Sequence, residues 1–142
     1  MGKINKPRVL LGGLVAGIVI NVVEGVMHGV VLANQDAEMM TRLNLSTAAS
    51  AGRIVALNAW GFALGILTLT VYSAIRPRMG AGPGTAMRAG LFVWAGACVL
   101  GAAVPGILGI YKLDLTLINL GYELVMMLVA SVAGAAVYKE EA

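Results

Sequence analysis

Four apolar segments divide this chain, and each is about as long as a helix that crosses a lipid bilayer. They cover about residues 9–33, 54–75, 89–110 and 115–138, against the roughly 20 residues that a transmembrane helix needs. Hydrophobic residues make up 59% of the sequence and charged residues only 12%, which is too apolar for a soluble domain of this size. The sequence therefore predicts an all-α integral membrane protein, a four-helix transmembrane bundle that forms a single domain over residues 1–142.

Lysine and arginine are distributed unequally between the two ends of the predicted helices. Seven lie before the first span, between the second and third, or after the fourth: Lys3, Lys6, Arg8, Arg76, Arg78, Arg88 and Lys139. The other two connections hold three: Arg42, Arg53 and Lys112. Because cytoplasmic loops are rich in Lys and Arg, both termini are predicted to be cytoplasmic, in a multi-pass protein of the bacterial inner membrane. The net charge of +3 follows mostly from this topology, so the expected partner is the lipid bilayer and not a nucleic acid.

The longest connection, about residues 34–52, contains a candidate for a short helix. This helix would begin near Asp36 and place Met39, Met40 and Leu43 on one side. Such an amphipathic segment is expected to lie at the membrane interface, in the first periplasmic loop, where it would cover the mouth of the bundle. The alternative is an ordinary connector whose apolar side rests on lipid.

Small and polar residues share one face on each predicted helix. On the first helix these are Gly13, Gly17, Asn21, Glu24 and His28, and on the fourth Asn119, Glu123, Met126, Ala130 and Gly134. The second helix places Asn58, Gly61 and Gly65 on one side. In membranes, small residues let helices approach closely and polar residues turn inward to find partners. These faces are therefore predicted to form the inside of the bundle, or to dock a second copy or a partner in a membrane complex.

The polar residues are also predicted to lie at one depth. At 1.5 Å per residue, Glu24 lies about 13 Å and Glu123 about 12 Å below the outer ends of their helices. By the same count His28 is level with Asn119, and Asn58 is close to both. A glutamate at membrane depth costs roughly 3 kcal/mol, which marks it as a functional residue. We therefore expect one polar pocket in the outer half of the bundle.

Carboxyl groups in such a pocket are expected to exchange protons. Burial disfavours the charged form, and two close carboxylates repel each other, so one of them would hold a proton. Asn21, Asn58 and Asn119 would supply neutral hydrogen bonds. The predicted function is therefore to bind or translocate a cation or a small polar solute, with Glu24, His28 and Glu123 as its ionisable residues.

Three other functions are compatible with the same residues. Glu24, His28 and Glu123 could bind a divalent metal, because carboxylate and imidazole are common ligands, although one histidine and no thiolate cluster make a small ligand set; no other cofactor is expected. The polar residues could instead only set helix packing in an accessory or scaffolding subunit. An intramembrane enzyme, with the two glutamates as acid and base, is the third function. No nucleophile motif or phosphate loop supports an enzyme.

Overall fold

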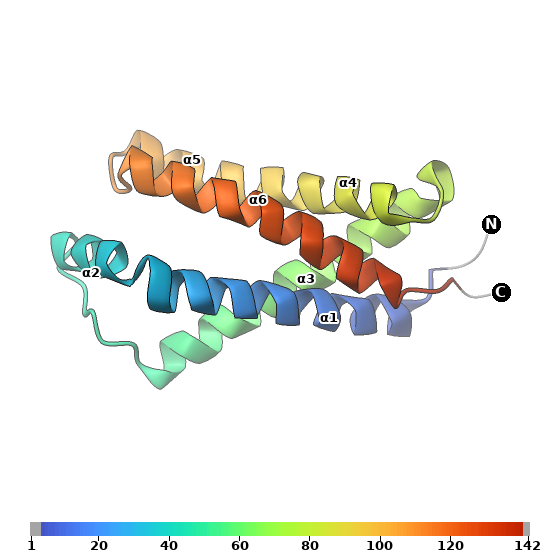
Figure 1. The fold of residues 1–142 in the computed structure, drawn as a ribbon, viewed down its shortest axis with the longest axis horizontal. Helices are drawn as coiled ribbons and strands as arrows, with labels where there is room; N and C mark the ends of the chain where they lie inside the picture. Colours follow the sequence, from blue (N-terminus) through green and yellow to red (C-terminus); the bar gives the residue numbers. More distant parts are fainter. Residues whose placement is uncertain (1–3, 141–142) are drawn as a thin grey trace.

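The computed structural model describes residues 4–140, which form helices and no strand. The first span consists of α1 (Lys6–Val26) and the π-helix η1 (Met27–Val31), and the second is α3 (Ala51–Met79). The third combines α4 (Pro83–Val93), the π-helix η2 (Trp94–Val99) and α5 (Leu100–Ile107), and the fourth is α6 (Leu113–Ala136). The short helix α2 (Ala33–Arg42) follows the first span. The start of α1 and the end of α6 lie at one end of the bundle and α2 at the other (Figure 1).

All four spans are long and apolar enough to cross a membrane. Their continuous helical lengths are 26, 29, 25 and 24 residues, over Lys6–Val31, Ala51–Met79, Pro83–Ile107 and Leu113–Ala136. This result confirms the prediction of an all-helical chain with four spans. The chain thus has the build of a multi-pass membrane protein.

The second and third spans are longer than predicted, and the loop between them is shorter. Helix α3 continues through Pro77 to Met79, because a proline so near the end of a helix removes only one of its last hydrogen bonds. Gly80 and Gly82, with φ of 82° and 133°, then turn the chain, and Pro83 starts α4 at a position where proline is favoured. The breaker residues of the predicted loop therefore belong mostly to helix ends.

Glycines bring the backbones of α1 and α3 into direct contact. A Cβ atom on Gly65 would overlap the Gly13 carbonyl oxygen, and a Cβ on Gly13 would lie 2.7 Å from the Cα of Ile66. Likewise, a Cβ on Gly17 would lie 2.9 Å from the Cα of Phe62. Only glycine fits at such crossings. These small-residue faces are thus filled by contacts within the chain.

Buried side chains are concentrated in the half of the bundle near the termini. This packed half comprises residues 9–20, 61–73, 85–93 and 126–138. Its fully buried members include Ile20, Leu69 and Met127, and helix α6 packs here against both α1 and α4. The four spans therefore meet around one continuous core at this end.

The opposite half of the bundle is loosely packed. This open half comprises residues 21–31, 51–60, 94–107 and 113–125, in which Leu115 is the one buried residue. The first turns of α3 diverge from α6, as Figure 1 shows, and Leu57 and Trp60 are 61% and 60% exposed. Both π-helices also lie in this half. Its polar side chains are consequently not held in place by a dense core.

Candidate functional site

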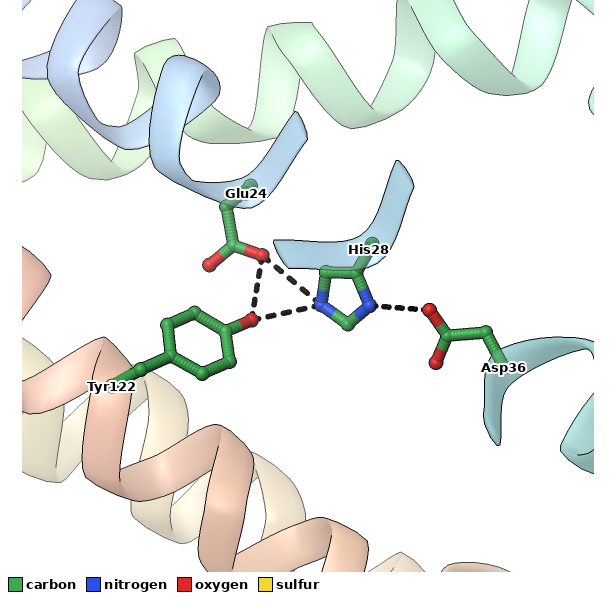
Figure 2. Close-up of polar contacts among 4 residues, drawn as sticks. All are labelled: Glu24, His28, Asp36 and Tyr122. Atoms are coloured by element: carbon green, nitrogen blue, oxygen red, sulfur yellow. Dashed lines mark hydrogen bonds and ion pairs between the residues drawn. The ribbon is translucent and has the colours of Figure 1, made fainter. Parts of the chain in front are cut away.

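Four polar side chains meet in the open half, and they come from four different elements. Glu24 lies near the end of α1, His28 in η1, Asp36 in α2 and Tyr122 in α6. Figure 2 shows the imidazole of His28 at the centre, with a carboxylate on either side of it. We call these four residues the His28 cluster. The cluster links the first span to the fourth span and to α2.

The distances within the His28 cluster are those of hydrogen bonds. The Nδ1 atom of His28 lies 2.7 Å from Oδ2 of Asp36, and Nε2 lies 2.8 Å from the Tyr122 hydroxyl oxygen. The same hydroxyl lies 3.0 Å from Oε2 of Glu24, which is itself 3.2 Å from Nε2 of His28. The Tyr122 oxygen, Glu24 Oε2 and His28 Nε2 thus form a triangle, and Asp36 binds the far side of the ring.

The local backbone explains why His28 can reach α2. The amide of Leu32 donates to the carbonyl of Met27, five residues earlier, so the first span ends in a π-helical turn. Such a turn holds one more residue than an α-helical turn and is frequent at functional sites. Leu32 is buried where the chain enters α2. The bend places Asp36, eight residues after His28, against the imidazole.

Helix α6 points two neighbouring side chains in different directions. Tyr122 reaches the first span, whereas the carboxyl group of Glu123 lies beside Cys98 in η2 and interacts electrostatically with Glu24 and His28. Adjacent residues differ by 100° around a helix, and α6 packs between the first and third spans. Glu123 therefore belongs to the electrostatic surroundings of the His28 cluster without a hydrogen bond to its members.

The three predicted asparagines have separate contacts. Asn21 donates to the backbone carbonyl of Asn58 at 3.2 Å, and Asn58 donates to the carbonyl of Ile54 in its own helix. Asn119 lies one turn before Tyr122, and its side-chain oxygen is buried with no hydrogen-bond partner among residues 4–140. Asn21 and Asn58 thus join α1 to α3, and of the three side-chain oxygens only that of Asn119 is both buried and without a partner among residues 4–140.

The His28 cluster is partly accessible. The side chains of His28, Glu24 and Asp36 are 39%, 31% and 20% exposed. Next to Asp36, a cavity of about 50 Å³ lies between α2 and the start of α6. It is lined by Gln35, Glu38, Met39, Arg42, Lys112, Asp114 and Leu115. This volume holds a few waters or a small ion, and none of the four cluster residues lines it.

A metal site on Glu24, His28 and Glu123 stays a prediction from the sequence. Among the described residues, no three His, Cys, Asp or Glu side chains are arranged to hold a metal ion. Glu24 lies 3.2 Å from Nε2 of His28, and Asp36 binds the opposite ring nitrogen. Within the described residues, the cluster is a chain of hydrogen bonds.

Asp36 and Tyr122 are site residues that sequence reasoning missed. Asp36 was expected only as the start of a short helix, because helical periodicity carries no information across the turn that precedes it. Tyr122 directly precedes Glu123, and the fact that α6 packs against two helices is the reason that both residues point inward. A hydroxyl next to an intramembrane carboxylate is the signal that could have identified Tyr122.

Fold and site together define a multi-pass α-helical membrane protein with a cluster of ionisable residues in one half of its bundle. Comparisons of the chain with protein-family models, curated proteins and solved structures gave no match. Its function must therefore be inferred from the side chains themselves.

Proposed function

We propose that this chain is a small protein of the bacterial inner membrane that binds or translocates a cation or a small polar solute in exchange for a proton. The observation that carries the proposal is the placement of His28 between two carboxylates and a hydroxyl from another span. With both termini in the cytoplasm, as the Lys and Arg distribution favours, the cluster faces the periplasm. Helix α2 then lies at the outer interface.

When both ring nitrogens of His28 carry protons, each of its partners is satisfied. Nδ1–H donates to Asp36, Nε2–H donates to the Tyr122 oxygen, and the Tyr122 hydroxyl donates to Glu24. The positive ring also offsets one of the two adjacent negative charges. In this state the hydrogen bonds of the cluster are all made between its own members, and no position is left for a cation.

Loss of one proton from His28 breaks the chain of hydrogen bonds at Glu24. Nδ1 keeps a proton for Asp36, so Nε2 becomes an acceptor, and the hydroxyl of Tyr122 has a single proton to give. When that proton goes to Nε2, Glu24 loses its donor. A partly buried carboxylate without a partner is costly, so a cation or a donor group from a solute takes the place of the missing proton.

The surroundings of Glu24 favour a ligand that brings positive charge or hydrogen-bond donors. Glu123 adds a second carboxyl group within electrostatic range, and Asn119, on the same face of α6, offers a buried oxygen without a donor. Opposite charge within about 4–6 Å of a carboxylate stabilises its ionised form. An anion would meet repulsion from Glu24, Asp36 and Glu123 together.

Cation-driven proton release tests this function. Purified protein in weakly buffered detergent is mixed with sodium, potassium or methylammonium chloride, and a pH-sensitive dye records the released protons. We expect at least one of these cations to release up to about one proton per chain, because a single imidazole proton is exchanged. The Glu24→Gln variant should release none. The control is Glu38→Gln, which removes an acid of α2 that pairs with Lys112 outside the cluster and should release as much as wild type.

Two outcomes would contradict the proposal. One is the absence of proton release with all three cations, and the other is equal release from Glu24→Gln and wild type. Either result would leave the polar residues with the role of setting helix packing, as in an accessory or scaffolding subunit.

A further inference from the structure

A second polar cluster lies at the opposite end of the bundle, where α1 begins and α6 ends (Figure 1). It consists of Tyr72 and Arg76 in the last turns of α3 and Tyr138 and Glu140 just after α6. The two tyrosine rings stack edge to face at 5.7 Å and are 3% and 5% exposed. The guanidinium carbon of Arg76 lies 5.3 Å from the centroid of the Tyr138 ring. The guanidinium group of Arg76 thus lies against the buried ring of Tyr138 at the end of two spanning helices.

Several donors of this cluster lack an acceptor within the described residues. Nε and Nη1 of Arg76 and the hydroxyl of Tyr138 are buried and make no hydrogen bond there. Glu140 places a carboxylate oxygen 3.0 Å from Nη1, but this ion pair lacks the alignment of a hydrogen bond. Buried donors without an acceptor are rare in folded proteins and indicate a bound water, ion or ligand. All of the unsatisfied groups here can donate, so the missing group is an acceptor.

The guanidinium and its setting favour an anion with several oxygens. Arginine on an aromatic ring keeps its N–H groups free at the edge of the plane, the arrangement that recognises phosphate. The same end carries further basic residues: Lys6, Arg8, Arg78 and Lys139. Basic pockets between transmembrane helices at a membrane surface bind the headgroups of anionic lipids.

We propose that Arg76 and Tyr138 form a binding site for the phosphate group of an anionic phospholipid. In the absence of lipid, the carboxylate of Glu140 offsets part of the charge of Arg76, so lipid and Glu140 compete for the same guanidinium. The site lies at the end of the packed half of the bundle and uses no residue of the His28 cluster, and it is therefore independent of the function proposed above.

Native mass spectrometry of the detergent-purified full chain tests the site. The protein is mixed with equal amounts of phosphatidylglycerol or phosphatidylcholine that carry the same acyl chains, and the bound lipid is counted. We expect phosphatidylglycerol to be retained about fivefold more than phosphatidylcholine, the effect of one favourable basic contact. Arg76→Gln should abolish this preference. Arg78→Gln removes an exposed arginine two residues further along α3, which adds only to the general positive charge of this end, and should lower the preference much less than Arg76→Gln.

Two further variants keep the test decisive if Arg76→Gln fails to fold. Glu140→Gln removes the competing carboxylate and should increase retention of phosphatidylglycerol, whereas Tyr138→Phe keeps the ring, loses the hydroxyl and should decrease it. Equal losses from Arg76→Gln and Arg78→Gln, or no gain from Glu140→Gln, would overturn the site. Displacement of the lipid by millimolar inorganic phosphate would also overturn the lipid assignment, because the site would then take a soluble anion.

Discussion

The two halves of the bundle differ in the interactions that hold the four spans together. In the packed half, backbones touch at glycines and the side chains of Leu69 and Met127 are completely buried. In the open half, η1 makes no extensive backbone contact with another span, and the bonds of His28 and Glu24 to Tyr122 connect it to α6. Stability and ionisable chemistry are thus spatially separated.

This separation has a physical reason. Closely packed cores resist change of even one methylene, whereas a site that exchanges ligands must open locally at low cost. The half-exposed side chains of Glu24 and His28 can change partners without disturbing the contact between α1 and α3. Variants in the two halves should therefore differ in what they damage.

The largest effect is expected from Gly65→Ala, in the packed half. The added Cβ would overlap the backbone of Gly13 and Gly17, and no side-chain rotation relieves such a clash, so we expect a loss of about 1–3 kcal/mol in unfolding free energy. The matched change is Gly25→Ala in the open half, where nothing lies within 4 Å of the new Cβ. It should change stability by less than about 0.5 kcal/mol. Chemical unfolding in detergent measures both, and similar losses would refute the division into two halves.

Tyr122→Phe should have the next largest effect. It removes the hydroxyl that bonds Glu24 and His28 and should cost about 1 kcal/mol, since a polar contact between membrane helices contributes at most about 1–2 kcal/mol. Amides of η1 should also exchange hydrogen faster. Tyr111→Phe, which changes an exposed tyrosine in the turn before α6, is the control. Unchanged exchange in η1 would mean that other contacts hold the first span.

Asp36→Ala should loosen α2 and little else. Its carboxylate binds Nδ1 of His28 at 2.7 Å, and the loss of about 1 kcal/mol from one partly buried hydrogen bond corresponds to roughly fivefold faster amide exchange. We expect this acceleration over Ala33–Arg42 in hydrogen-exchange mass spectrometry. Asp36→Asn keeps an acceptor oxygen and should restore most of the protection. If amide exchange in α2 does not change in Asp36→Ala, the ion pair between Glu38 and Lys112 is sufficient to hold this helix.

The smallest effect is expected from Asn21→Ala. Asn21 bonds the carbonyl of Asn58 where the packed half meets the open half, and an average polar contact between membrane helices is worth about 0.6 kcal/mol. Thermal unfolding should therefore shift only slightly. A loss as large as that of Gly65→Ala would show that this polar contact, and not glycine packing, sets the crossing of α1 and α3.

Much of the fold can be predicted from the sequence because spans are determined by length and composition. All four predicted segments correspond to observed helices. Their ends are less predictable, since Pro77 is tolerated near the end of α3 while Pro83 begins α4. The π-helices η1 and η2 consist mostly of ordinary apolar residues. The sequence alone therefore does not indicate where a helix takes the wider π-helical turn.

The candidate site could be predicted only in part. Glu24 and His28 are four residues apart, and this spacing places them on one helix face. Their partners, however, depend on three-dimensional contacts that helical periodicity does not contain. Asp36 is brought to His28 by the turn between η1 and α2, and Tyr122 is brought to Glu24 by the orientation of α6. Glu123, the next residue of α6, makes no hydrogen bond to Glu24 or His28 within the described residues, and a pocket shared by the two glutamates stays a prediction.

The protonation state of His28 tests the central claim most directly. His28 is the single histidine of the sequence, so ¹⁵N-histidine labelling of protein without a histidine tag gives one pair of ring-nitrogen signals, which report protonation and tautomer. In sodium-free, potassium-free buffer, at a pH where both nitrogens are protonated, we expect addition of sodium, potassium or methylammonium to convert His28 to the neutral form with its proton on Nδ1. Signals that stay unchanged with all three cations would contradict proton-linked cation binding at this site.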